Sequence, residues 1–94
     1  MGFMIYNIIY HENITRDIAK MSLKDKKIIQ KSIENKLKID PLLFGRPLRE
    51  SLSGHRRLRV GDYRIVFRIE DETVKILAIK HRSTVYEKIY SRIF

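Results

Sequence analysis

The sequence predicts one α+β domain, in which a four-stranded antiparallel sheet carries an N-terminal helical hairpin on one face and is followed by a C-terminal helix. Three observations support this fold class. The chain has 94 residues, 44% of them hydrophobic, which is enough for one core but not for two. Apolar residues recur at helical spacing over residues 12–39 and 83–93, and strand-like patterns occupy residues 55–80. We therefore expect residues 1–94 to form a single domain.

The N-terminal part of the chain predicts one strand and two helices. Residues 3–10 are almost all β-branched, aromatic or aliphatic, and this run is too short for a stable helix but suits a buried strand. Asn13 can cap a short helix over residues 12–21, and Ser22 can cap a longer one that ends near residue 39. Two helices joined so closely form an antiparallel hairpin that can cover a sheet. Its expected apolar stripe consists of Leu23, Ile28, Ile29, Ile33, Leu37 and Ile39.

Asp40 and Pro41 end the second helix, because a residue before proline avoids the α region. The segment that follows, residues 41–54, has too much Gly and Pro for regular structure, although its Leu and Phe side chains favour burial. We expect an ordered connector there.

Three strands and a helix complete the chain. The strands cover residues 55–60, 63–70 and 73–80, and each two-residue turn between them sets the register of a hairpin. Gly61 at the first position of the first turn suits type II′. Ser83 can cap the terminal helix over residues 83–93.

The predicted register sorts the side chains of these three strands onto two faces, because paired residues point the same way. The aliphatic face is expected to form the core under the helical hairpin. It contains Leu58, Val60, Ile65, Phe67, Ile69, Val74, Ile76 and Ala78.

The opposite face collects positive charge around a few apolar side chains. It contains His55, Arg57, Arg59, Arg64, Arg68, Lys75, Val66, Leu77 and Ile79, with His81 following in phase. Arg56 falls on the apolar side and must extend along an edge. A solvated sheet face can carry charge without function. However, neighbouring like charges such as Arg59 beside Arg64 destabilise a sheet, so we favour an anion-binding face suited to phosphate.

The bulk composition agrees with a polyanionic partner. Twenty Lys and Arg against eleven Asp and Glu give a formal net charge of +9. Nucleic acid is the first candidate, ahead of an anionic membrane or an acidic protein, although a solvated basic surface explains the charge as well. Cys is absent, which excludes disulfides and thiolate catalysis. No signal peptide or membrane-spanning segment is visible, so we expect a cytoplasmic protein without a membrane partner.

Cleavage of a phosphodiester without a metal needs a base, cations for the developing charge and an acid for the leaving oxygen. In RNA the 2′-hydroxyl itself can attack. Arg57 and Arg64 can clamp the phosphoryl oxygens. His55 can act as the base, or it is a surface histidine at the start of a strand; neither reading is preferred by spacing alone.

More than one reading also exists for the general acid and for the residue that would stack on a nucleobase. His81, Lys80 or Arg82 can protonate the leaving oxygen. Tyr86 can stack on a nucleobase, or it packs the terminal helix onto the sheet. His11, His55 and His81 do not complete a ligand set, so no metal is expected.

A family resemblance rests on residues of the meander and its flanks. These are Leu58, Arg59, Val60, Gly61, Asp62, Tyr63, Arg64, Ile65, Val66 and Phe67, then Leu77, Ala78, Ile79, Lys80, His81 and Arg82, with Val85 and Tyr86, preceded upstream by Asp40, Pro41, Gly45, Arg46, Pro47 and Leu48. Through them the chain resembles the RelE/ParE superfamily of bacterial and archaeal toxins over nearly its whole length.

The resemblance implies a RelE-like, microbial-RNase-like α+β fold. For the RelE branch it implies a toxin of a type II toxin-antitoxin system, namely a ribosome-dependent mRNA endonuclease that cuts by metal-independent 2′-hydroxyl attack. It further implies mRNA, the ribosomal A site and a cognate antitoxin as partners, and no small-molecule cofactor.

The resemblance also implies roles for individual residues. By position, Arg57 matches a catalytic lysine or arginine, Arg64 the arginine that stabilises the transition state, and Tyr86 the tyrosine that orders the substrate. His55 stands where the RelE prototype has a lysine proposed as the base, so this chain departs from the family there.

The acid arginine of the family aligns with Lys80 or Arg82, depending on a gap of two residues, and Arg82 is preferred. The remaining basic groups are expected to bind RNA; they are Arg59, Arg68, Lys80 and His81.

Two other functions stay open. The ParE branch of the superfamily inhibits DNA gyrase and lacks the ribonuclease residues, and a non-catalytic module would only bind RNA or an antitoxin. Basic residues at 57, 64 and 82 together with Tyr86 favour the nuclease, so we rank it first, the gyrase inhibitor second and the pure binder third.

Overall fold

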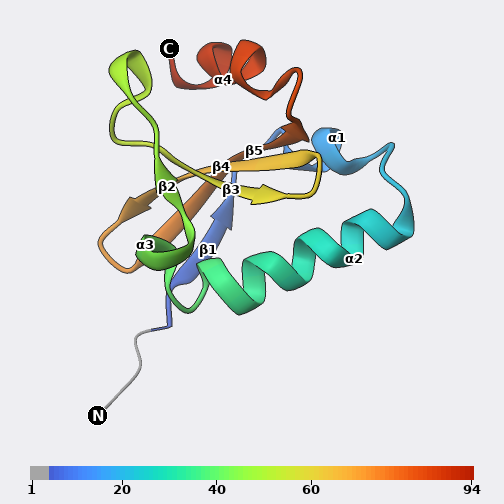
Figure 1. The fold of residues 1–94 in the computed structure, drawn as a ribbon, viewed down its shortest axis with the longest axis horizontal. Helices are drawn as coiled ribbons and strands as arrows, with labels where there is room; N and C mark the ends of the chain where they lie inside the picture. Colours follow the sequence, from blue (N-terminus) through green and yellow to red (C-terminus); the bar gives the residue numbers. More distant parts are fainter. Residues whose placement is uncertain (1–4) are drawn as a thin grey trace.

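The computed structural model describes residues 5–94, so residues 3 and 4 of the predicted first strand lie outside the described part. Figure 1 shows a sheet in the middle of the molecule, with α2 on one side and α4 on the other. The elements are β1 (Asn7–Tyr10), α1 (Ile14–Ile18), α2 (Leu23–Ser32), the π-helical turn η1 (Ile33–Leu37), α3 (Pro41–Phe44), β2 (Arg46–Pro47), the 3-10 turn η2 (Glu50–Leu52), β3 (Arg56–Val60), β4 (Tyr63–Glu70), β5 (Thr73–His81) and α4 (Val85–Ile93). Within residues 5–94, none of the helices combines the length and the apolar character needed to cross a membrane.

The α+β class and the arrangement of helices are confirmed, but the predicted sheet is wrong in two respects. Residues 5–94 form a five-stranded sheet in the order β1-β5-β4-β3-β2, and β1 runs parallel to β5. The extra strand, β2, has two residues, too few to show a pattern in the sequence. The parallel pairing is possible because the helices after β1 supply the long crossover that parallel strands need.

The connector after Pro41 has more regular structure than predicted. The Asp40 carboxylate accepts a hydrogen bond from the Leu43 N–H at 3.2 Å, and Pro41 opens the one-turn helix α3. The expected burial is wrong for Leu42 and Leu43, which are 60% and 71% exposed. A single capped turn is too short to show helical periodicity in the sequence. Asp40 and Pro41 therefore indicated only the end of the preceding helix and not the start of α3.

The predicted caps are confirmed in one case of three. The Ser22 hydroxyl accepts the Asp25 N–H at 3.1 Å and starts α2. The Asn13 side chain makes no cap; its own N–H donates to the His11 ring instead. α4 begins two residues after Ser83, behind Thr84, without a side-chain cap. Of the predicted apolar stripe, Ile29, Ile33 and Leu37 are buried, whereas Leu23, Ile28 and Ile39 are exposed.

The predicted register is correct for β3 and β4 and fails halfway along β5. Arg59 lies opposite Arg64 as expected, and Gly61 has the positive φ, 58°, that the predicted turn requires. Past the Phe67–Ile76 pair the register shifts by one residue at a β-bulge.

The bulge exchanges the faces of the residues that follow it. Ala78 pairs with Val66 and leaves the predicted core face, Ile79 pairs with Ile65 and enters it, and Lys80 pairs with Arg64. These predictions were wrong because counting in steps of two cannot detect an inserted residue.

The sheet separates two apolar clusters. The larger lies under α1, α2 and η1 and contains Ile14, Ile29, Ile33, Leu37, Leu58, Val60, Ile65, Phe67, Val74, Ile76 and Ile79. The smaller lies under α4 and contains Leu52, Val66, Ala78, Val85 and Ile89. The face predicted to be open is thus covered in part by α4, and its basic residues are confined to the remainder.

Candidate functional site

Five of the predicted site residues meet in one hollow beside the start of α4. Its lining residues are Arg57, Arg64, His81, Arg82, Ser83 and Tyr86, and its volume is about 390 Å³. β3 and β4 supply the first two, the end of β5 and the loop after it the next three, and the first turn of α4 supplies the tyrosine. In Figure 1 this is where the chain leaves β5 and passes the β3–β4 turn to enter α4.

Tyr86 joins the hollow to the smaller core. Its side chain is half-buried against the apolar cluster under α4, and its hydroxyl accepts a long hydrogen bond, 3.4 Å, from Nη1 of Arg57. Both roles considered for Tyr86 are therefore compatible, because one part of the side chain packs while another part lines the hollow. The contact also holds the Arg57 guanidinium at the wall of the site.

Arg64 is fastened to the turn that precedes it. Its Nη1 donates to the carbonyl oxygens of Gly61 and Tyr63, each at 3.0 Å. Its other guanidinium nitrogens make no hydrogen bond to any residue between 5 and 94. Arg64 is thus held by one nitrogen, with donors left over for an anion in the hollow.

His81 and Arg82 are positioned by the loop into α4. The Ser83 N–H donates to Nδ1 of His81 at 3.1 Å, so the neutral ring carries its proton on Nε2 and offers it as a hydrogen-bond donor. The Arg82 N–H donates to the Asp62 carbonyl at 2.7 Å, whereas its side chain makes only a 3.7 Å ion pair with the exposed Asp62 carboxylate. A pair of this kind contributes little, so the Arg82 guanidinium can turn into the hollow.

The charged side chains that line the hollow are basic. Arg57 and Arg64 make no ion pair with a carboxylate in the part of the chain that the structure describes. Arg59 lies opposite Arg64 on the neighbouring strand, and Arg46 lies opposite Arg57. Like charges in directly opposed positions destabilise a sheet by a few tenths to about 1 kcal/mol each, and an anion in the hollow would remove that repulsion.

Four predicted residues lie outside this hollow, and one of them, Arg59, lies on β3 opposite Arg64. His55 is buried, at 7% exposed, and its Nδ1 has no hydrogen-bond partner among residues 5–94. The Lys80 ammonium lies 3.3 Å from the carboxylate of Asp17, which belongs to α1. Arg68 pairs with Glu70 at 3.2 Å.

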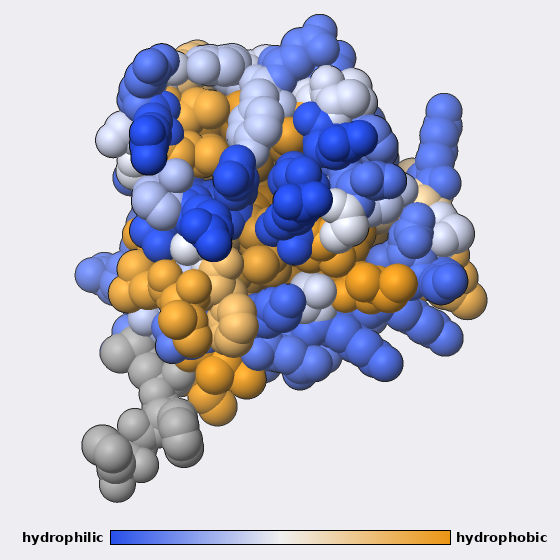
Figure 2. All heavy atoms as spheres, in the orientation of Figure 1, coloured by the Kyte–Doolittle hydropathy of each residue, from blue (hydrophilic) through white to orange (hydrophobic). Residues whose placement is uncertain are grey.

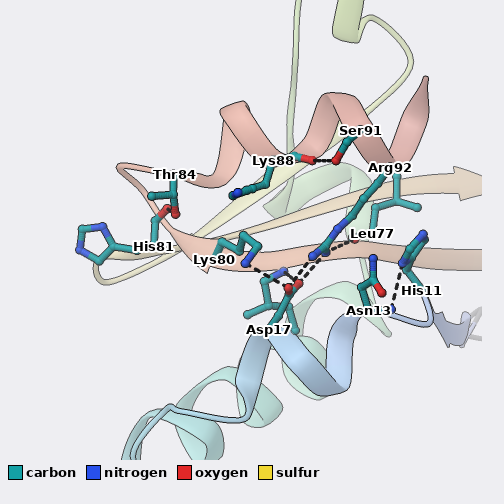
Figure 3. Close-up of polar contacts among 11 residues, drawn as sticks. His11, Asn13, Asp17, Leu77, Lys80, His81, Thr84, Lys88, Ser91 and Arg92 are labelled. Carbon is teal, nitrogen blue, oxygen red and sulfur yellow. Dashed lines mark hydrogen bonds and ion pairs between the residues drawn. The ribbon is translucent and has the colours of Figure 1, made fainter.

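One polar network was missed by the sequence analysis, and Figure 3 shows it where α1, β5 and α4 meet. The side chain of Asp17 is completely buried, and both its oxygens accept hydrogen bonds of 2.6 Å from the Arg92 guanidinium. It also accepts the Ile79 N–H at 3.0 Å, while Arg92 donates to the Leu77 carbonyl at 2.9 Å. Because β1 ends opposite Ile76, these bonds satisfy backbone groups on the part of the β5 edge that no strand of the described residues covers.

The network is ionised at neutral pH. Burial raises the pKa of the Asp17 carboxyl, but hydrogen bonds from Arg92, Ile79 and Lys80 outweigh it and hold the pKa below its usual value. The same hydrogen bond to Asp17 raises the pKa of Arg92. The network therefore fixes the C-terminal part of α4, the helix whose first turn carries Tyr86.

Comparisons with known proteins agree on a single family. The model of a family described as the ParE toxin of a type II toxin-antitoxin system, parDE, matches residues 8–86. Toxin RelG of Mycobacterium tuberculosis is 33% identical over 87 residues, which are 90% of this chain and all of the relative. Toxin RelE of the same organism is 35% identical over 83 residues, 82% of this chain and 86% of the relative. Among solved structures, the toxin-antitoxin complex RelBE2 of M. tuberculosis superposes with a TM-score of 0.78 at 32% identity, covering 87% of this chain and 97% of that one.

Proposed function

The chain belongs to the RelE/ParE superfamily of type II toxin-antitoxin toxins, and from this membership we propose that it is an endoribonuclease that cuts mRNA in the ribosomal A site by metal-independent 2′-hydroxyl attack. We take residues 1–94 as one toxin domain. The observation that supports this reading best is the hollow lined by Arg57, Arg64, Arg82 and Tyr86, because these are residues to which the resemblance to the RelE branch assigns catalytic roles.

In this mechanism the cations of the hollow carry most of the catalysis. Attack by the 2′-oxygen on the adjacent phosphorus places extra negative charge on the phosphoryl oxygens in the transition state. Arg64 and Arg57 are held in place before the substrate arrives, so they stabilise that charge without rearranging. A single preorganised donor of this kind is worth about 10²–10³ in rate.

The other roles follow from position. Tyr86 stacks on a base next to the scissile phosphate and so aligns the 2′-hydroxyl. Arg82 is assigned to the leaving 5′-oxygen, because it is exposed and only loosely paired. His81 donates a hydrogen bond from Nε2 to the RNA. For the base that takes the 2′-proton, His55 is the candidate that the sequence offers.

We propose two kinds of partner. The first is a cognate antitoxin, since the similar RelBE2 structure is described as a toxin-antitoxin complex. The second is mRNA on the ribosome, for which the charge of +9 provides general attraction.

The experiment is to add the purified protein to ribosomes that are translating a defined mRNA and to map new 5′ ends. We expect cuts inside codons in the A site with the native chain and none with Arg64→Ala. Arg16→Ala is the matched control, because Arg16 is exposed on α1 and lies outside the hollow; it should cut like the native chain. Intact mRNA with the native chain would contradict the proposal.

A second candidate is inhibition of DNA gyrase, which is favoured by the name of the matching family model, the ParE toxin. The same preparation added to a gyrase supercoiling reaction separates the two. Supercoiling that stops while mRNA on ribosomes stays intact would establish this alternative.

A further inference from the structure

A second basic hollow lies next to the first, at the β2–β3 edge of the sheet. It is lined by Phe44, Arg46, Arg57, Leu58 and Arg59 and has a volume of about 400 Å³. Arg57 lines both hollows, so one guanidinium borders the proposed cleavage site and this neighbour. Figure 2 shows strongly hydrophilic side chains over β2 and β3, directly beside an apolar area over α3.

The cations of the second hollow have no anion to balance them. No Asp or Glu lines it, and Arg46 and Arg59 are exposed and form no ion pair within residues 5–94. Arg46 lies directly opposite Arg57 in the β2–β3 pair. A pair of like charges facing each other across two strands is unfavourable unless an anion lies between or beside them. Guanidinium groups in such an array suit the oxygens of a phosphodiester.

Phe44 adds an aromatic surface to the array. It is 39% exposed at the end of α3, and the Lys36 ammonium lies 5.8 Å from its ring centroid. An exposed aromatic ring between cations is the usual platform on which a base of single-stranded nucleic acid stacks.

The backbone around Phe44 is tightly held. Nη2 of Arg56 donates to the carbonyl oxygens of Gly45 at 2.8 Å and Leu42 at 3.2 Å. Gly45 is packed so closely that a Cβ there would lie 2.2 Å from Cζ of Phe67. α3 is thereby fastened against the edge of β3, and Phe44 and Arg46 are presented on a fixed segment of chain.

The edge beside them is also open. β2 pairs with β3 through Arg46–Arg57 and Pro47–Arg56, so beyond Arg57 no strand within residues 5–94 pairs with β3 on that side. An extended strand of RNA that leaves the first hollow past Arg57 can follow this edge.

We propose that the second hollow is a nucleotide subsite for the residue next to the dinucleotide that is cleaved in the first hollow: Arg46 and Arg59 bind its phosphate, and Phe44 stacks on its base. This inference rests on the proposed function, which supplies RNA as the polyanion and places the cleaved dinucleotide in the first hollow. It makes affinity depend on the length of the RNA, since a ligand too short to pass Arg57 cannot reach Phe44 or Arg46.

The test measures binding of the full-length protein to uncleavable 2′-O-methyl RNA of two and of six nucleotides, by fluorescence anisotropy. The native chain should bind the six-nucleotide RNA more tightly. Arg46→Ala and Phe44→Leu should each weaken binding of the longer RNA about fivefold or more and leave the shorter one within twofold. Arg46→Ala should also make log K less steep against log salt by about 0.7, the loss of one phosphate contact on a single strand.

Arg16→Ala removes the same charge from an exposed site on α1. Apart from the small loss of general electrostatic attraction, it should change neither the affinity for RNA nor the slope of log K against log salt. Because Arg46 is exposed, its variant is expected to fold even if Phe44→Leu does not. The inference is overturned if both variants affect the two lengths equally, or if they leave RNA binding unchanged and instead weaken binding of the antitoxin. These readouts do not depend on cleavage, so length-dependent RNA binding without any mRNA cleavage would remove the nuclease proposal and keep the subsite.

Discussion

Two clusters of charge in this molecule are built on opposite principles. Around Asp17, one completely buried carboxylate is saturated by Arg92, Lys80 and a backbone N–H. In the hollow beside α4, Arg57 and Arg64 line the same space, and no carboxylate among residues 5–94 lines it with them. In both clusters, hydrogen bonds to neighbouring residues hold the arginine side chains in place. They differ in whether the counter-charge belongs to the chain.

The difference separates a structural role from a functional one. A buried charge that has lost its water must find its partner within the fold, because leaving it unpaired costs several kcal/mol. A half-exposed arginine keeps part of its hydration and tolerates the lack of a partner, so it remains available to an incoming anion. We therefore expect substitutions at the Asp17 cluster to act on stability and substitutions in the hollow to act on activity.

The largest expected effect is that of Asp17→Ala on folding. It leaves Arg92, which is 8% exposed, without its anion and the Ile79 N–H without its acceptor. We expect a loss of about 3–5 kcal/mol in the free energy of unfolding, measured by urea denaturation. The control is Asp62→Ala, which removes an exposed carboxylate 3.7 Å from Arg82 and should cost less than about 1 kcal/mol. Equal losses for the two variants would erase the distinction between the clusters.

The next effect is that of Arg64→Ala on catalysis. Removal of a preorganised donor should lower the rate of mRNA cleavage on ribosomes about 10²–10³-fold. The free energy of unfolding should fall by less than about 1 kcal/mol, because the lost bonds are two contacts to the turn at the surface. A drop in stability as large as that of Asp17→Ala would show that Arg64 holds the fold rather than the substrate.

The pH dependence of stability should be traceable to Asp17. Its pKa is lower in the folded chain than in the unfolded one, where it is about 3.9. The ionised carboxylate therefore contributes stability above about pH 4, and this contribution is lost as the pH falls through the folded pKa. Urea denaturation between pH 6 and pH 2 should show a steeper loss for the native chain than for Asp17→Asn. Parallel curves would assign acid unfolding to other carboxyl groups.

The two clusters also differ in how far the sequence predicts them. Arg57, Arg59 and Arg64 were placed on one face because the turn at Gly61 sets the register of a hairpin, which is local information. The Asp17–Arg92 contact joins residues 75 positions apart through the end of α4 and the unpaired edge of β5. It depends on where β1 stops and on the bulge between the Phe67–Ile76 and Val66–Ala78 pairs, and neither feature produces a periodic pattern in the sequence. Lys80 was predicted as a candidate acid and an RNA-binding residue, and its contact with Asp17 was missed because it depends on the same packing of α1 against β5.

His55 is the residue for which sequence and structure lead to different expectations, and its substitution should have the smallest effect. The sequence offers two readings, a base or a surface histidine at the start of a strand, but the ring is buried and does not line the hollow. We expect His55→Leu to change the rate of cleavage by less than threefold. It should change the free energy of unfolding by less than about 1 kcal/mol, because it replaces a buried ring whose Nδ1 has no partner among residues 5–94 with an apolar group. A rate loss of 10²-fold or more, together with loss of the acid limb of the pH–rate profile, would instead establish His55 as the base. That outcome would mean that the segment from Leu52 to Arg56 moves when RNA binds, so that the ring reaches the 2′-hydroxyl.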